Sequence, residues 1–333
     1  MKRLFFSLFV SLVCITNAFA QQQMAVLSHN GEIKAFYGVS AYQQAIAVAN
    51  HGDIITLSSG VFDAADIDKT LNIRGSGMEN DINTGRGATF IQGDYSICID
   101  NEEKKLFIEG ICFNGTMVVQ GKNDLDHLIL NKCKFTKHSA HGISLSTGDS
   151  VAIKCIITNC KINNSFCLNQ PSLEAYNSFI RAYTDGHFYN CIGYIPYEMS
   201  HCHIHNSVAI ASGSVHIYEN NSFSNSIIAG DYEKEPNGSF DSFYFKNYGC
   251  PMFNVETTYL DDIFKNPDFD GDYMDKCDFI LADKYNKNDI GMYGGVAPYT
   301  PILNLPTITN INVDKESDEK GLLGVGIEVS GVK

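Results

Sequence analysis

The chain has 333 residues, of which 44% are hydrophobic and 19% charged, a balance that excludes a disordered or collagen-like protein. Its formal net charge is −14 and it contains no dense run of Lys or Arg, so nucleic acid and anionic membranes are not expected partners. After the N-terminal segment, no stretch reaches the roughly 18 apolar residues of a membrane-spanning helix, so no transmembrane anchor is expected.

The first 20 residues have the pattern of a secretory signal peptide. A basic start at residues 2–3 precedes an apolar run over residues 4–15 and an Ala-Phe-Ala cleavage motif at 18–20. We therefore expect cleavage after Ala20 and a protein that is secreted, periplasmic or at the cell surface. Because Cys14 leaves with this segment, ten of the 11 cysteines remain, and an even number in a secreted chain allows disulfides.

Residues 40–50 are the one segment with a clear helical pattern. Ser40 and Gln43 fit a capping box, and Gly52 is expected to end the helix. We expect this short N-terminal helix to cap the open end of the domain. Its apolar residues fall on one face: Tyr42, Ala45, Ile46 and Ala49.

Beyond residue 54, short apolar runs alternate with Gly, Asn, Asp and Ser, which is typical of strands separated by turns. Ile111 and Cys133 are 22 residues apart and Cys133 and Cys160 are 27 apart, as in a solenoid coil. Several runs share one pattern, which is apolar, polar, Asn or small, Cys or Ile, polar, then Phe or Ile: Ile108–Phe113, Leu130–Phe135, Ile157–Ile162 and Met199–Ile204.

Stacked coils would align like residues about 4.8 Å apart in parallel sheets. The cysteines are then small apolar stackers inside the solenoid, and Asn at the corners tolerates the bent backbone. Disulfides are the alternative, with Cys155–Cys160 and Cys250–Cys277 as the nearest pairs. The repeat length predicts about 9–11 coils.

The segments GDIITLSSGVFD (52–63) and KTLNIRGSG (69–77) resemble the opening coils of the pectate-lyase-like superfamily. DIGMYGG (289–295) resembles a closing coil of secreted bacterial members, and PILNLPTI (301–308) resembles tails of Bacteroidetes relatives. The resemblance covers about residues 38–306. It implies an all-β fold, a right-handed parallel β-helix solenoid over residues 21–306, followed by a tail, 307–333, that is solvated or adds capping strands.

This resemblance implies carbohydrate chemistry, by a polysaccharide lyase or a glycoside hydrolase. The family's hydrolase motifs are incomplete, because the Gly-His pair at 186–187 lacks a second glycine and the Asp-Asp pair at 261–262 follows it. The best lyase candidates are Arg181, Asp185 and His187. Arg181 would neutralise a uronate or act as base, Asp185 would hold Ca²⁺, and His187 would move a proton.

The tyrosine-rich segment 176–197 is a candidate sugar-binding site without catalysis, because exposed tyrosines can stack on sugar rings. The alternative is that half of these rings pack in the core or in loops. The candidates are Tyr176, Tyr183, Tyr194 and Tyr197.

Three histidines alternate along one segment, as His201, His203 and His205. If Cys202 and Ile204 point inward, all three histidines share the outer face and could hold Zn²⁺ with positions open for water or substrate. His187 and His216 would lie on neighbouring repeats, and the acidic residues at 268–275 superficially resemble a Ca²⁺ loop. The alternative is a polar outer strand that binds no metal.

Three functions remain open. The first is a secreted carbohydrate-interacting protein that binds, and in its stronger form cleaves, a polysaccharide or cell-surface glycan. The second is a non-catalytic surface or adhesin-type solenoid, supported by the lack of a complete catalytic set. The third is a metal-dependent enzyme that uses the histidine strand. A monomer is expected in each case.

Overall fold

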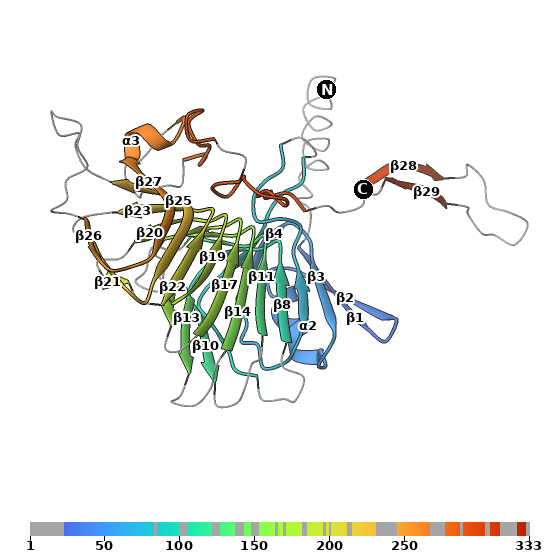
Figure 1. Ribbon diagram of the computed structural model, residues 1–333. Helices are drawn as coiled ribbons and strands as arrows, with labels where there is room; N and C mark the ends of the chain where they lie inside the picture. Colours follow the sequence, from blue (N-terminus) through green and yellow to red (C-terminus); the bar gives the residue numbers. More distant parts are fainter. Residues whose placement is uncertain are drawn as a thin grey trace, which may run out of the picture.

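The computed structural model describes a protein built almost entirely of strands wound into stacked coils (Figure 1). The described residues are 23–82, 85–99, 105–121, 127–136, 143–147, 153–163, 166–168, 171–181, 185–195, 198–199, 201–211, 215–230, 245–266, 277–286, 289–303, 307–313 and 325–330. Among them, no helix is long and apolar enough to cross a membrane.

The coils have three faces, and each coil contributes one strand to the first of them. Ten strands stack in parallel on this first face, which agrees with the 9–11 coils predicted from the repeat length. Their order is β3 (Ile54–Leu57), β5 (Asn72–Arg74), β8 (Lys105–Glu109), β11 (His127–Asn131), β14 (Ile153–Thr158), β17 (Pro171–Tyr176), β19 (Gly186–Tyr189), β22 (Cys202–His205), β25 (Ser222–Gly230) and β27 (Met252–Tyr259).

A second face follows the corner after each of these strands. It contains β4 (Gly60–Asp63), β6 (Thr89–Gln92), β9 (Cys112–Asn114), β12 (Lys134–Phe135), β15 (Lys161–Ile162), β18 (Phe179–Ile180), β20 (Ile192–Ile195) and β23 (Val208–Ala211), and then the later halves of β25 and β27. Because β25 and β27 run through both faces, the two are joined in one 20-stranded sheet.

A third face is made in two parts. The earlier part is β7 (Tyr95–Ile97), β10 (Met117–Gly121), β13 (Ile143–Thr147) and β16 (Phe166–Leu168). The later part is β21 (Glu198–Met199), β24 (Val215–Tyr218) and β26 (Phe245–Tyr248). The parallel β-helix expected from the sequence repeats is therefore the fold of the chain.

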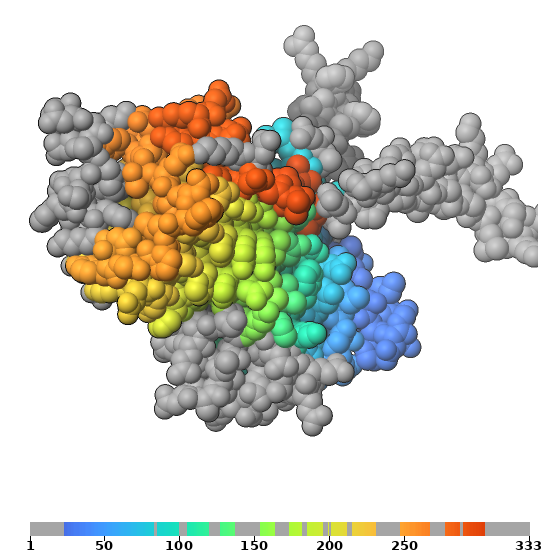
Figure 2. All heavy atoms as spheres, in the orientation of Figure 1, coloured from blue at the N-terminus to red at the C-terminus, as the bar shows by residue number. Residues whose placement is uncertain are grey.

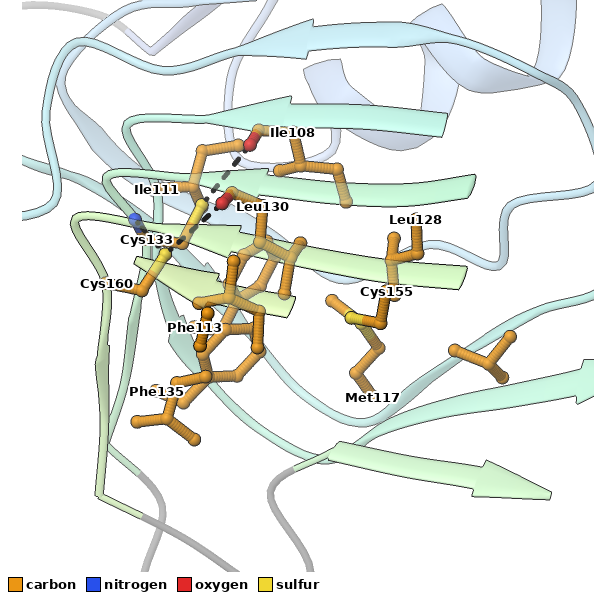
Figure 3. Packing of buried hydrophobic residues seen from close by; sticks show 14 of the residues in the cluster. Ile108, Ile111, Phe113, Met117, Leu128, Leu130, Cys133, Phe135, Cys155 and Cys160 are labelled. Atoms are coloured by element: carbon orange, nitrogen blue, oxygen red, sulfur yellow. Dashed lines mark hydrogen bonds between the residues drawn. The ribbon is translucent and has the colours of Figure 1, made fainter. Parts of the chain in front are cut away.

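The core fills the inside of the coils with like residues stacked on like. Phe113 and Phe135 stack with their ring centroids 4.9 Å apart, and Cys133 and Cys160 stack at the corner beside them (Figure 3). Burial of each Ile, Leu or Phe side chain stabilises the folded state by about 1.5–3 kcal/mol relative to leaving it exposed to water. Stacking identical residues keeps the shape of successive coils the same, which keeps the strands in register.

The corner between the first and second faces is a ladder of residues with left-handed backbone. From β8 onward, one such residue stands in each coil where the first face ends, and in β25 and β27 it lies within the strand: Gly110, Lys132, Asn159, Asn177, Asn190, Asn206, Asn225 and Asn254. Asparagine is favoured because its short amide tolerates this conformation and bonds locally. Asn225 donates to the Oδ1 of Asn206 at 2.9 Å, and Asn254 donates to that of Asn225 at 2.7 Å.

The next residue in each corner is most often Cys or Ser, and these side chains form a second ladder. The Cys160 N–H donates to Ser178 Oγ at 3.0 Å, and the Cys191 N–H donates to Ser207 Oγ at 2.9 Å. The inward cysteines predicted from the repeats are confirmed at Cys133, Cys160 and Cys191. Cys202 is also buried, but Met199–Ile204 spans the corner from β21 to β22 and is therefore out of register with the other repeats, and Cys98 is exposed. All nine described cysteines are free, so neither Cys155–Cys160 nor Cys250–Cys277 is bonded here.

An antiparallel hairpin covers the first coil, and the sequence patterns above did not predict it. β1 (Met24–His29) pairs with β2 (Glu32–Tyr37) on one side and with β3 on the other, also antiparallel. The turn Asn30-Gly31 has positive φ at both residues, as a two-residue hairpin turn requires. The edge of the first coil is therefore closed by the chain itself.

The expected capping helix follows as α2 (Ala41–Val48), and its predicted apolar face is buried. The capping box is wrong. Ser40 makes no cap hydrogen bond, because Gln44 donates to its Oγ, and Gln43 donates instead to the Ala64 carbonyl. The helix also ends at Val48, before Gly52.

The C-terminal part of the chain does not form the closing coil that the resemblance of residues 289–295 implies. After the short helix α3 (Leu260–Ile263), residues 277–286 and 289–303 run back over the outside of earlier coils (Figure 2). Lys132 donates to the Ile302 carbonyl at 2.6 Å, and Asn177 donates to the carbonyls of Met292 and Gly294. We call residues 289–303 the strap.

The tail contains two more strands, β28 (Thr307–Val313) and β29 (Val325–Ser330), which pair with each other antiparallel. They form their own sheet, separate from the coils.

Candidate functional site

The C-terminal part of the chain covers the second face and leaves the first face open. In β23, Ala209 and Ala211 point into the core, whereas Val208 and Ile210 point outward into a second apolar cluster. That cluster includes Ile263, Phe264, Phe279 and Met292 from the C-terminal part. An open surface built from outward side chains in these later coils therefore lies on the first face or on the third, where Tyr218 and Tyr248 stack with centroids 5.2 Å apart. The first face has the longer rows.

Two rows of outward side chains cross the first face where it is open. Alternate residues of each strand point outward, and the parallel register brings them into line. The first row is Glu174, His187, His203 and Ser222, and the second row is Tyr176, Tyr189, His205 and Ser224. We call these eight residues the outer rows.

The rings of the outer rows stack on one another along the solenoid. Tyr176 and Tyr189 have centroids 5.1 Å apart and planes 9° apart, and Tyr189 and His205 have centroids 5.2 Å apart and planes 8° apart. In the first row, His187 and His203 have centroids 4.6 Å apart. Because neighbours cover the ring faces inside each stack, the stacks present ring edges, hydroxyls and imidazole nitrogens to the outside.

A charged pair lies at one end of the rows. Lys154 Nζ is 2.9 Å from a Glu174 oxygen, and the Tyr176 hydroxyl donates to the other Glu174 oxygen at 3.2 Å. The hydrogen bond from Lys154 lowers the pKa of Glu174, against a smaller opposing effect of burial. Glu174 is therefore a charged acceptor at neutral pH.

The two strand histidines are hydrogen bonded to the serines of the next coil. His203 Nδ1 is 2.8 Å from Ser222 Oγ, and His205 Nδ1 is hydrogen bonded to Ser224 Oγ. Burial lowers the pKa of His203, and the neighbouring imidazoles His187 and His201 lower it further. The pKa of His205 is lowered in the same way, first by burial and then by His203 and His187. Both rings are neutral at pH 7.

The structure does not bring the three lyase candidates onto one face. Arg181 follows β18 on the second face, where it is exposed and donates to the Asn163 carbonyl. His187 lies in the outer rows. Asp185 precedes β19 and lies 3.5 Å from His201 Nδ1.

The tyrosine candidates are also divided. Tyr176 lies in the outer rows, but Tyr194 points outward from β20 on the second face, where it packs against the cluster that covers that face. Tyr183 and Tyr197 lie outside the described residues. Tyr189 belongs to the site, although it was not selected from the sequence. The position of Tyr189 in the repeat, two residues before Cys191, was the available signal.

The histidines are placed partly as expected. His203 and His205 lie on the outer face between the inward Cys202 and Ile204. His201 instead has a left-handed backbone at a turn, with φ of 52°. His187 does join His203, whereas His216 lies on β24 of the third face, against Tyr248.

In the part of the chain that the structure describes, no group of three or more His, Cys, Asp or Glu residues is placed to hold a metal ion. The acidic residues at 268–275 all lie outside the described residues. Comparison of the chain with protein-family models, with curated proteins and with solved structures found no match.

Proposed function

We propose that this chain is a secreted carbohydrate-binding β-helix protein of the pectate-lyase-like type, and that the outer rows are its polysaccharide-binding surface. The observation that carries the proposal is a change of chemistry along one row. In the earlier coils this row contains Phe107, Ile129 and Ile156, and from β17 onward it becomes Glu174, His187, His203 and Ser222. The fold does not require this change, because outward residues do not fill the core.

The outer rows offer the groups that hydroxyl-rich ligands need. The carboxylate of Glu174 accepts hydrogen bonds, the tyrosine hydroxyls donate and accept, and neutral imidazoles do both. These groups repeat from coil to coil, about 4.8 Å apart. A polymer that lies along the solenoid would meet them in succession, which suits a polysaccharide better than a small isolated ligand.

The charges favour a neutral polysaccharide. The chain has a formal net charge of −14, and Lys154, which borders the rows, is already paired with Glu174. A polyanion would meet repulsion from the whole molecule and from Glu174. The signal-peptide pattern at residues 1–20 supports an encounter with such a polymer outside the cytoplasm.

The proposal is tested by binding to a panel of immobilised neutral, uronic and sulfated polysaccharides, with release of reducing ends and unsaturated products followed in parallel. We expect the chain to bind a neutral polysaccharide, and the double variant Tyr176→Ser, Tyr189→Ser to bind it at least tenfold more weakly. Tyr37→Ser is the matched control, because Tyr37 is an exposed tyrosine on β2. A wild-type chain that binds no member of the panel would contradict the proposal.

A further inference from the structure

The second row is a stack of rings with one ring missing. Tyr176, Tyr189 and His205 follow one another at centroid spacings of 5.1 and 5.2 Å. The next position is Ser224, and the position after it in the parallel register is Phe253. An aromatic ring therefore lies on each side of a small serine.

Phe253 is held at this position by the corner ladder. The residues that directly follow His205, Ser224 and Phe253 are Asn206, Asn225 and Asn254, all with left-handed backbone. Their side-chain amides are joined by hydrogen bonds of 2.9 and 2.7 Å. The three coils are thus fixed in register immediately beside the row.

The gap is open to solvent on the Phe253 side. The Phe253 side chain is 77% exposed, although its neighbour Met252 packs against the core. Burial of this exposed ring against the apolar face of a ligand would therefore add a favourable contribution to the free energy of binding.

The width of the gap selects the kind of ring that fits. His205 and Phe253 are two coil repeats apart, which is about 9.6 Å along the solenoid. One ring inserted midway would continue the spacing seen between the existing rings. A pyranose ring is thicker than a flat aromatic ring because its C–H bonds project from both faces, so it fills this interval better.

We propose that one pyranose ring of the bound polysaccharide inserts between the rings of His205 and Phe253, over Ser224. This inference rests on the proposed function and locates its main apolar contact. The C–H groups on the two faces of the sugar would contact the two rings, and the Ser224 hydroxyl would lie beneath its edge. The inserted sugar sets the register of the polymer on the outer rows.

The test fills the gap or removes one wall, with the affinity of the full chain for its best-binding panel polysaccharide measured by isothermal titration calorimetry. Ser224→Phe completes the stack with a protein ring, and Phe253→Ala removes a wall. We expect each variant to bind at least tenfold more weakly, with circular dichroism unchanged. Thr257→Phe is the control for the added ring, because Thr257 is an exposed residue of β27 on the second face, and it should bind as the wild type does.

The outcomes separate the two proposals. If Ser224→Phe and Phe253→Ala both bind like the wild type while the Tyr176→Ser, Tyr189→Ser variant binds weakly, the sugar does not insert, and the outer rows remain the binding surface. If the wild type binds no polysaccharide, both proposals are wrong.

Discussion

Buried cysteines in this chain occupy two different environments. Cys191 lies in the corner ladder, where its Sγ donates to the Tyr189 carbonyl at 3.4 Å. Cys155 lies inside the solenoid between Leu128 and Leu173 of the adjacent coils. Burial raises the pKa of both thiols to about 12, so both stay protonated at neutral pH.

These environments predict opposite responses to the same substitution. Cys191→Ser should change the free energy of unfolding by less than about 1 kcal/mol, because serine already serves at the equivalent positions 178 and 207. Cys155→Ser should cost about 1–3 kcal/mol, because it places a hydroxyl among apolar side chains. Urea unfolding followed by circular dichroism measures both, and equal losses would contradict the distinction.

The stacked histidines predict a pH dependence of stability. The pKa values of His203 and His205 are lowered in the folded protein, so the unfolded chain binds more protons as the pH falls through about 6.5. The stability that depends on neutral rings is complete above that pH and declines below it. We expect the melting temperature to fall between pH 7 and pH 5, and to fall less in His203→Gln, His205→Gln. An identical slope in that variant would show that other groups cause the loss.

At the scale of single residues, the sequence predicts inward positions better than functional ones. Cys133 and Cys160 could be placed because most coils have a small residue, Cys or Ser, at that corner. Cys202 is also inward, but it points into the core from β22 and not from that corner. Phe253 could not be placed, because coils of unequal length hide its register with Ser224 and His205. The core imposes the repeat, whereas outward residues are free of it.

Among the elements, the strap shows how the later coils are covered. Met292 is fully buried between the second face and the C-terminal cluster, while Val296, four residues later, is fully exposed. The strap also takes hydrogen bonds from Lys132 and Asn177 of the corner ladder. Together with the buried side chains of Ile290, Tyr299 and Leu303, Met292 therefore anchors an otherwise irregular segment to several coils.

Truncating Met292, the most deeply buried of these side chains, should loosen the strap. We expect Met292→Ala to cost about 2–5 kcal/mol of stability and to speed limited proteolysis within residues 289–303. Val296→Ala, in the same segment, should change neither measurement. Unaltered cleavage in Met292→Ala would mean that the other buried side chains and the ladder hydrogen bonds hold the strap without it.

The elements that differ from the sequence-based prediction lie at the two ends of the chain. The hairpin β1–β2 has a sequence signal of its own, Asn30-Gly31 between alternating apolar residues. Residues 289–295 look like a coil because they are short, apolar and glycine-rich. Glycine instead allows the close approach of the strap to the coils, since a Cβ on Gly295 would lie 2.9 Å from Asn190 Oδ1.

For the whole molecule, the solenoid makes stability a sum of contacts between neighbouring coils. The interior coils gain contacts on both sides, so an uncovered end is the weakest point and also exposes unpaired strand edges. β1 covers the first coil through four residue pairs with β3, from Ala25–Leu57 to Ser28–Ile54. Because β1 runs antiparallel to β3, the parallel stack of coils ends at β3.

The hairpin β1–β2 should therefore decide whether the molecule stays monomeric. A chain that begins at Gly38 lacks β1 and β2 and leaves the edge of β3 unpaired. We expect it to form concentration-dependent oligomers in light scattering after size exclusion, whereas the chain that begins at Gln23 stays monomeric. As a control, Ile33→Lys changes only an exposed residue of β2, so it should behave like the longer chain. A monodisperse short chain with an unchanged melting temperature would show that α2 alone protects the first coil.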